Sequence, residues 1–318
     1  MRAIAGLPLV FVVCLTAGLA MAAGLAMAAP QEIEIPETLR PGDQYELLLR
    51  SSQVRFGQSA GVQQAVSTAH VTLEVGEGQD GYRVVTWTYR DIGFQGGGPA
   101  RPILERIARL AEGQRIQYYL NGEGVVAGVR NMEELLQFNR VAIDELLAVM
   151  AEQPGGEQAV DLTRRMTQPL LSAVIVESQS LKVPQLFHFF SGLILEPEVT
   201  YSYEEDLPTP VGVAIPSIGE FAMTGHDVPG GVATIEWRQY PDSDRASEAT
   251  RQMVEMMLAP SGTALPKEVD LSSVVIEDQG TFDMDLTTGL PRSLVHERRI
   301  EILGRGRVER TEITLVEN

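Results

Sequence analysis

Alternating apolar and polar residues run through much of the chain and predict β-strands. The stretch from Asp43 to Phe56 alternates in this way, and "HVTLEVGEGQDGYRVVTWTYRDIGF" then supplies two further β-rich runs. These two runs meet at Asp80-Gly81, and Asp-Gly between strands is a strong hairpin signal. The segment "RIQYYLNGEGVVAGV" repeats the arrangement around Asn121-Gly122. The first part of the chain is therefore predicted to contain antiparallel hairpins.

Apolar residues at helical spacing predict two helices after the first strands. The segment "PILERIARLAEG" begins with Pro102, which the first turn of a helix tolerates, and ends at Gly113. Asn131 is predicted to cap the following helix, "MEELLQFNRVAIDELLAVMAE". This helix has the clearest apolar stripe in the chain.

A further helical region is predicted over about 161–191, with interruptions at Pro169 and Pro184. Its end, "VPQLFHFFSGLIL", is apolar on nearly all sides, which is typical of a buried segment. The stretch 242–258 also has helical spacing, and its first turn is acidic, as the helix dipole favours.

The last third of the chain returns to β-type patterns. Prolines at 208, 210 and 216 predict that "LPTPVGVAIPSIG" is an extended connector outside any central strand. A β pair joined near Gly230-Gly231 follows, and the chain ends in three β runs, at 274–286, 293–303 and 307–316. Tight hairpins without alternating βαβ units predict an antiparallel α+β protein. We predict an N-terminal lobe over 29–195 and a C-terminal lobe over 196–318.

The first 28 residues have the pattern of a secretory signal peptide. Arg2 precedes a long apolar stretch, and Ala26-Met27-Ala28 offers a small-x-small cleavage site. We predict cleavage after Ala28 and an exported protein, periplasmic or extracellular. An uncleaved membrane anchor stays open as the alternative, because about 20 apolar residues can span a bilayer. Cys14 is the only cysteine and lies in this segment, so the mature chain has neither disulfides nor thiolate chemistry.

Charge narrows the range of partners. The formal net charge is −18, and loss of Arg2 makes it about −19. Such an acidic surface repels phosphate backbones and anionic headgroups, which argues against nucleic acid as a partner and against a peripheral membrane role. The four histidines are scattered without metal-ligand spacing, and the Gly-rich "QGGGPARP" lacks the Lys-Ser/Thr of a phosphate loop. We therefore expect no cofactor.

One serine lies in a pattern that is known from hydrolases. Residues 57–61, "GQSAG", fit G-x-S-x-G with Ser59 as the nucleophile, and Asp285 and His296 follow in chain order. If the intervening turn is centred near Leu290, Asp285 and His296 lie roughly opposite each other on a hairpin. The motif comes before any strands that could supply an oxyanion hole, and no parallel sheet is predicted. We therefore predict no catalytic residues and keep a serine hydrolase as an alternative.

The two aspartates in "FDMDL" raise the question of a metal site. In a strand, Phe282, Met284 and Leu286 point to one side, and Asp283 and Asp285 point to the other. This is the pattern of a half-buried strand, and no further acidic cluster lies nearby in sequence to complete a calcium shell. We predict the outer face of a hairpin and no metal site.

Large aromatic residues are the candidates for ligand binding. Two tryptophans occur in predicted strands and three phenylalanines in the apolar helical segment. Such residues are usually core, but they would line an apolar pocket if the sheet curved around one. The predicted ligand-binding set is Trp87, Phe187, Phe189, Phe190 and Trp237.

The C-terminal run, residues 282–315, resembles a unit of LolA-like lipoprotein-carrier proteins of the bacterial envelope. In that unit a strand ends in an acidic residue, a "t-x-LP" turn follows, and two long antiparallel strands complete it. The matching residues here are Asp285, Thr288, Leu290 and Pro291. The resemblance implies a strongly curved antiparallel sheet closed by helices, with an apolar cavity for lipid chains.

Together, these observations predict a curved antiparallel sheet with helices packed on one face. The expected function is non-enzymatic binding of an apolar ligand, either a lipid or a lipoprotein, or of an envelope protein partner. A serine hydrolase using Ser59 and a purely structural envelope protein are the alternatives.

Overall fold

The structure is a computed structural model that describes residues 31–57, 63–96, 101–152, 156–209, 212–258, 274–302 and 304–316. The predicted signal peptide and Ser59 lie outside the described residues. Glu32–Asn318 form one compact unit. None of the helices within the described ranges combines the length and the apolar character needed to cross a bilayer.

The strands and helices follow one another in blocks. The strands are β1 (Ile33–Glu34), β2 (Gln44–Phe56), β3 (Gln63–Gly76), β4 (Arg83–Gly96), β5 (Arg115–Leu120), β6 (Val126–Val129), β7 (Ile194–Leu195), β8 (Thr200–Pro208), β9 (Ala214–Asp227), β10 (Val232–Pro241), β11 (Val275–Asp285), β12 (Pro291–Ile302) and β13 (Arg305–Val316). The helices are α1 (Arg101–Ala111), α2 (Met132–Ala151), α3 (Gly156–Thr167), the 3-10 helix η2 (Gln168–Leu171), α4 (Ala173–His188) and α5 (Ser247–Leu258).

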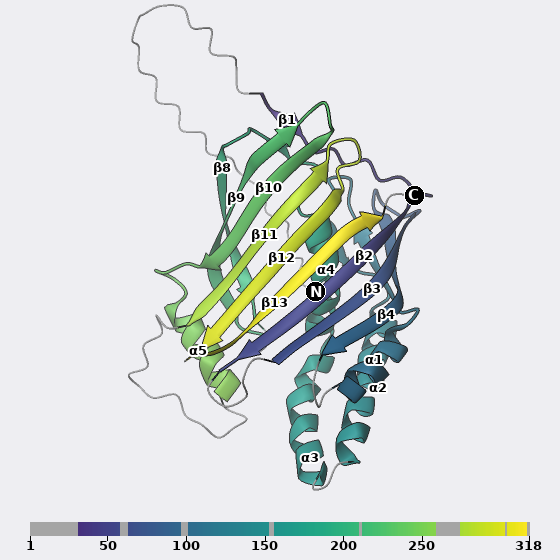
Figure 1. The fold of residues 1–318 in the computed structure, drawn as a ribbon, viewed down its shortest axis with the longest axis vertical. Helices are drawn as coiled ribbons and strands as arrows, with labels where there is room; N and C mark the ends of the chain where they lie inside the picture. Colours follow the sequence, from purple (N-terminus) through teal and green to yellow (C-terminus); the bar gives the residue numbers. More distant parts are fainter. Residues whose placement is uncertain are drawn as a thin grey trace, which may run out of the picture. The chain divides into compact units, whose positions relative to one another are not determined.

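Eleven strands form a single antiparallel sheet in the order β6-β5-β4-β3-β2-β13-β12-β11-β10-β9-β8 (Figure 1). The strands β2 and β13, from opposite ends of the described chain, pair from Phe56–Gly306 to Glu46–Val316. This pairing joins two series of hairpins into one sheet with two free edges, β6 and β8. The predicted α+β class is confirmed. The division into lobes at residue 195 stays a prediction, and the sheet takes strands from both sides of it.

The hairpin signals in the sequence are correct where residues are described. Asp80 and Gly81, between β3 and β4, both take positive φ, at 55° and 83°. A tight two-residue hairpin turn needs this backbone conformation, and Asp-Gly is well suited to it. The β9–β10 and β11–β12 hairpins also form as predicted.

One face of the sheet, which we call the inner face, is covered by helices. Figure 1 shows α4 behind the strands, α1 and α2 beside β4, and α3 below the sheet next to α2. Inner-face positions alternate with solvent-facing ones, as in β11, where Phe282 and Met284 are buried and Thr281 is exposed. The main core lies between α4 and the sheet, and a smaller core lies beneath α5. We call the opposite side of the sheet the outer face.

Two predictions about prolines were wrong. Pro184 lies inside α4 without ending it, and the side chain is buried. A proline inside a helix costs about 3 kcal/mol, which packing of the surrounding apolar residues must offset. Pro216 lies in β9, which pairs with β8 and β10. The last residue of β9 that pairs with β10 in this direction is Ser217, opposite Pro241. Pro216 lies one residue beyond this pair, so no residue of β10 needs the N–H group that Pro216 lacks.

Asn131 stands at the start of α2 as predicted, but its side chain does not cap the helix. The Oδ1 atom accepts a hydrogen bond from the Gln117 backbone N–H at 2.9 Å. The Nδ2 atom donates to the Arg115 carbonyl and to Glu134. Asn131 therefore fastens the start of α2 to β5.

The turn between β11 and β12 connects three separate parts of the chain. Thr38 donates a hydrogen bond to the Thr288 carbonyl, and Ser191, just after α4, donates to the Gly289 carbonyl at 2.9 Å. Gly289 has a φ of 70°, and a Cβ built there would lie 1.5 Å from the Pro36 carbonyl oxygen. Only glycine fits this position, because both the backbone conformation and the space exclude a side chain.

Gly289→Ala should therefore destabilise the protein far more than a positive φ alone explains. Gly304 is the matched control, because it has a φ of 71° with open space where a Cβ would stand. We expect Gly304→Ala to cost about 1–2 kcal/mol and Gly289→Ala to cost several kcal/mol. Urea denaturation measures both, and equal losses would contradict the proposed contact with Pro36.

Candidate functional site: the inner face of the sheet

The five aromatic residues predicted to bind a ligand come together on the inner face, and we call them the aromatic cluster. Phe187, from α4, contacts Trp87 with ring centroids 5.5 Å apart. Phe189 contacts Trp237 at 5.6 Å and Phe190 at 4.8 Å. The end of α4 and the residues after it therefore lie between tryptophans from β4 and β10.

Each tryptophan is held by a tyrosine hydroxyl. The indole N–H of Trp87 donates to Tyr118 at 2.8 Å, and that of Trp237 donates to Tyr203 at 2.7 Å. Burial raises the pKa of both tyrosines, so their hydroxyls stay protonated at neutral pH. The polar atoms of the two pairs are thus satisfied inside an otherwise apolar core.

His188, the last residue of α4, extends the Trp87–Tyr118 pair. Its Nε2 atom lies 2.7 Å from the Tyr118 hydroxyl, which already accepts from Trp87 and so donates its proton to His188. The proton of the neutral ring is then on Nδ1, which has no hydrogen-bond partner among the described residues. Burial, together with the charge of Arg83, lowers the pKa of His188 to about 3.

The aromatic cluster is filled by its own side chains. Trp87 and Phe190 are fully buried, and Trp237 is 7% exposed. The helix α4 thus occupies the part of the inner face where the sequence predicted an apolar pocket. A ligand could reach these aromatic residues only if α4 moved.

A row of polar residues crosses the inner face beside the aromatic cluster. These residues come from neighbouring strands and lie side by side because of the strand register. Each pairs directly with the next residue of the set, except that Gly219 lies between the first two. We call this set the polar row: Tyr203, Gln239, Asp278, Arg298, Glu309 and Gln53. It lies between the main core and the smaller core under α5.

Asp278 is the centre of the polar row. Its carboxylate accepts two bonds from the Nε of Arg298, at 2.8 and 3.0 Å, one from Arg298 Nη2 at 2.6 Å, and one from His296 Nε2 at 2.7 Å. Burial raises the pKa of Asp278, but the hydrogen bonds from His296 and Arg298 and the charge of Arg298 outweigh it, so the net pKa is lowered. The carboxylate is therefore ionised and fully paired.

Solvent access increases along the polar row towards β13. The side chains of Asp278 and Arg298 are 1% and 13% exposed, whereas that of Glu309 is 26% exposed. Lys182 reaches this open end from α4, with its Nζ 3.4 Å from Glu309. Burial, followed by the charge of Arg298, lowers the pKa of Lys182. This ion pair ties α4 to the sheet beside the solvent-accessible end of the row.

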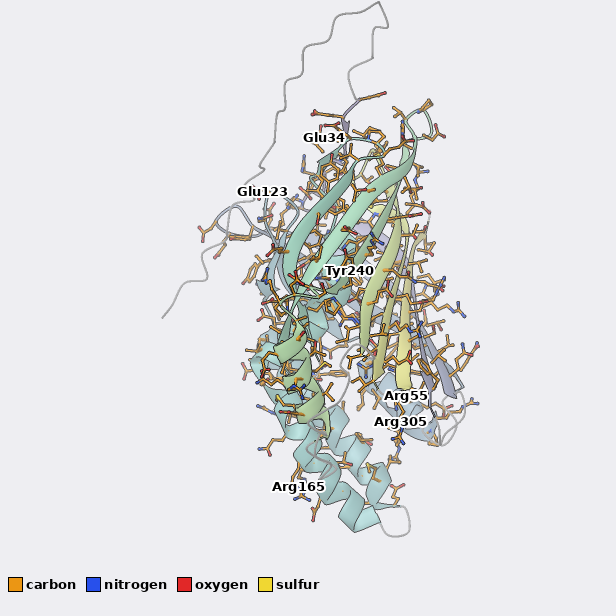
Figure 2. All side chains as sticks on the ribbon, turned by 90° about the vertical axis from the view of Figure 1, so that its left-hand side faces the viewer. Glu34, Arg55, Glu123, Arg165, Tyr240 and Arg305 are labelled. Carbon is orange, nitrogen blue, oxygen red and sulfur yellow. The ribbon has the colours of Figure 1, made fainter. Side chains whose placement is uncertain are left out.

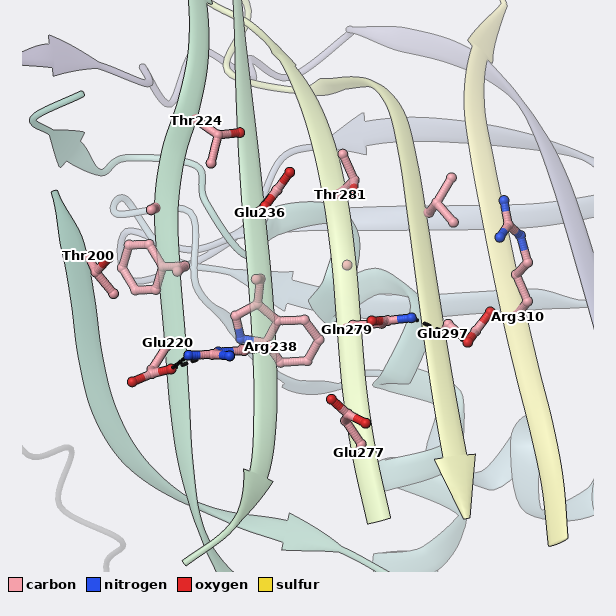
Figure 3. A pocket seen from close by; sticks show the side chains of 15 residues that line it. Thr200, Glu220, Thr224, Glu236, Arg238, Glu277, Gln279, Thr281, Glu297 and Arg310 are labelled. Carbon is pink, nitrogen blue, oxygen red and sulfur yellow. Dashed lines mark hydrogen bonds and ion pairs between the residues drawn. The ribbon is translucent and has the colours of Figure 1, made fainter. Parts of the chain in front are cut away.

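The outer face carries a groove of about 810 Å³ over β9 to β13 (Figure 3). Charged and hydroxyl side chains dominate its lining. Arg238 binds Glu220 at 2.6 Å, and Gln279 donates to Glu297 at 3.3 Å. This polar groove does not resemble the apolar pocket that the sequence predicted.

The predicted pairing of Asp285 with His296 was wrong. The register places His296 opposite Gly280, because the turn is centred before Leu290 and Met284 already pairs with Pro291. Asp285 accepts bonds from the Thr287 and Thr288 N–H groups and from Arg292, so it stabilises the turn. His296 is 2% exposed and bound to Asp278. Within the described part of the chain, no group of three or more His, Cys, Asp and Glu side chains is arranged to hold a metal ion.

Comparison with known proteins gives no family. No family model matches the chain, and no curated protein does. Among solved structures, a lipovitellin structure described in terms of lipid–protein interactions aligns with 87% of this chain, at 8% identity and a TM-score of 0.40. This chain spans a quarter of the lipovitellin chain. DynF, of the dynemicin biosynthesis pathway of Micromonospora chersina, and a porin-like protein of Bacteroides uniformis also align. DynF is 8% identical, and the alignment covers 91% of this chain and 86% of DynF with a TM-score of 0.19. The porin-like protein is also 8% identical, and the alignment covers 88% of this chain and 99% of that protein with a TM-score of 0.17. These scores are too low to support a shared fold.

Replacing the central carboxylate should expose the cost of the buried charge. In Asp278→Asn, Arg298 loses its anionic partner while remaining largely buried. We expect a loss of about 3–5 kcal/mol in the free energy of unfolding, measured by urea denaturation. Glu220→Gln, which breaks the solvent-exposed pair with Arg238, should cost about 1 kcal/mol or less. Similar losses in both variants would contradict a special role for Asp278.

His188 should make stability depend on pH. Its folded pKa of about 3 lies below the ordinary value of 6.5, so between these values the unfolded chain binds more protons and stability falls as pH decreases. We expect His188 alone to lower the free energy of unfolding by about 2 kcal/mol between pH 7 and pH 5.

In urea denaturation, His188→Gln should lose this part of the pH dependence. His226→Gln, which changes an exposed histidine, should retain it. An unchanged difference between pH 7 and pH 5 in His188→Gln would refute the assignment.

Proposed function

We propose that this protein is an exported, non-enzymatic carrier that binds the apolar chain of a lipid or lipoprotein on the inner face of its sheet. The chain would occupy the space that α4 fills. The observation that carries the proposal is the aromatic cluster, in which a single helix segment covers tryptophans from two distant strands. The proposal assigns the protein to the class of LolA-like carriers, which its C-terminal hairpin resembles.

The buried side chains of α4 and an acyl chain in the same place would gain comparable free energies of burial. Val176, Leu181 and Phe187 are the fully buried apolar side chains of α4 that pack in the main core. Burial of such side chains contributes about 1.5–3 kcal/mol each, or roughly 5–9 kcal/mol together. An acyl chain of about 12 carbons gains a similar amount, at about 0.8 kcal/mol for each CH₂. An apolar chain is therefore a plausible replacement for the buried face of α4.

A small number of polar contacts hold α4 in place. His188 leaves its Nδ1 without a partner, so the buried end of the helix is not fully satisfied. Ser191 holds this end through one hydrogen bond to the β11–β12 turn, and Lys182 holds the middle through Glu309. Exchange would also break the buried Tyr118–His188 hydrogen bond and the bond that Glu177 accepts from the Val129 N–H, and each such loss costs about 0.5–1.5 kcal/mol.

The alternatives have less support. Asp285 and His296 are separated by the register of the hairpin, and His296 is buried, so the hydrolase proposal loses two of its three residues. A purely structural role predicts a stable protein partner in crosslinking and no bound lipid. The proposed carrier predicts lipid in organic extracts of the purified protein.

The decisive test is the binding of a neutral apolar fluorophore, N-phenyl-1-naphthylamine, to delipidated protein. Ser191→Ala removes one tie on α4, so the open state should be more populated and the apparent affinity should rise about fivefold. Ser293→Ala removes a hydrogen bond to Asp283 on the outer face and should leave the affinity unchanged. No saturable binding, combined with lipid-free extracts, would rule out the carrier.

A further inference from the structure

Arginines from neighbouring strands meet at the open end of the polar row. Arg307, on β13, is the direct register partner of Arg55, on β2. Paired residues in a sheet share a face with Cβ atoms about 5 Å apart, and like charges in that position repel each other. Arg305 is the first residue of β13, and Figure 2 shows Arg55 and Arg305 at the same end of the sheet.

The carboxylates around these arginines do not balance their charge. Glu309 is shared between Arg307, at 3.0 Å, and Lys182, at 3.4 Å. Among the described residues, no carboxylate forms a salt bridge with Arg55 or Arg305, and Arg55 donates only to the neutral Gln53. This local group of side chains therefore carries an excess of positive charge, although the net charge of the chain is −18.

Arg307 also has an unused donor. Its Nε is buried and makes no hydrogen bond of acceptable geometry to any described residue, although Glu309 lies close to it. A guanidinium presents its donors as a planar fork that matches the oxygens of a phosphate or carboxylate. An oxyanion bound between Arg307 and Arg55 would accept from the two guanidinium groups and relieve the repulsion between the two side chains.

We propose that Arg55 and Arg307, with Lys182 beside them, form a binding site for an oxyanion, the phosphate or carboxylate headgroup of an amphiphile. This inference deepens the proposed function and, in its amphiphile part, rests on it. Thr311 lies four residues from Arg307 along the inner side of β13 and pairs with His296, whose ring contacts Trp237 with centroids 5.8 Å apart. A step of four strand residues covers about 13 Å. One amphiphile could therefore place its head at the arginines and its chain towards the aromatic cluster.

The test compares three ligands on the full delipidated chain: dodecyl phosphate, dodecyl maltoside and inorganic phosphate, with both amphiphiles below their micelle concentrations. We expect dodecyl phosphate to bind at least about tenfold more tightly than the neutral maltoside. The variant Arg55→Gln/Arg307→Gln should bind the two amphiphiles equally. The matched control, Arg50→Gln/Arg310→Gln, changes arginines on the outer face of the same two strands and should keep the preference.

The outcomes separate this inference from the proposed function. Equal binding of both amphiphiles by the wild type would overturn the oxyanion site and leave the carrier proposal intact. The same conclusion would follow if Arg50→Gln/Arg310→Gln lost the preference for dodecyl phosphate while Arg55→Gln/Arg307→Gln kept it. Binding of inorganic phosphate by the wild type but not by the double variant, with neither amphiphile bound, would support a site for a free oxyanion and refute the carrier. If the double variant does not fold, the single Arg55→Gln, at an exposed side chain, should reduce the preference.

Discussion

The apolar inner face of the sheet must be covered, and the rest of the structure depends on how this is done. Eleven strands with two free edges leave a wide surface, and the small two-stranded sheet of β1 and β7 packs in the same core without covering all of it. The helix α4 and the residues after it cover the main part with a few large side chains. The β11–β12 turn holds both the end of this helical segment and the N-terminal residues around Pro36. Distant parts of the chain therefore meet where the cover is fastened.

The polar row makes this packing specific. Apolar contacts alone would let a helix slide over a smooth apolar face, because the hydrophobic effect has no direction. Asp278 is saturated by His296 and Arg298, and Lys182 adds a contact from α4 to Glu309. A buried ion pair adds little net stability compared with apolar residues, but it strongly disfavours arrangements that leave a charge unpaired. We attribute the position of α4 on the sheet to the contact of Lys182 with this row together with the buried hydrogen bond between His188 and Tyr118.

Sequence patterns predicted the parts of the fold that depend on neighbouring residues. Hairpins such as the one at Asp80-Gly81, and the presence of the aromatic residues on one face, followed from local rules. The polar row could not be predicted in full, because it depends on the register of strands such as β2 and β13, which are far apart in sequence. The sequence did contain one signal. Asp278 lies four residues before Phe282 in the same strand, so its side chain points to the same face as that of Phe282, which is inward. The apolar segment at the end of the helical region indicated burial, but the surface it covers depends on strands that are distant in sequence.

Lys182 connects the two proposed sites. It lies on α4, which covers the aromatic cluster, and its amine binds the same carboxylate that Arg307 approaches. In the proposed mechanism, an anionic headgroup attracts Lys182 and Arg307 and so competes with Glu309 for both. Weaker pairing with Glu309 loosens α4, which gives the apolar chain access to the tryptophans. By linkage, an apolar chain that displaces α4 must also change the affinity of the arginines for an anion by the same factor. The two halves of one amphiphile would then bind cooperatively, and neither half alone would reproduce its affinity.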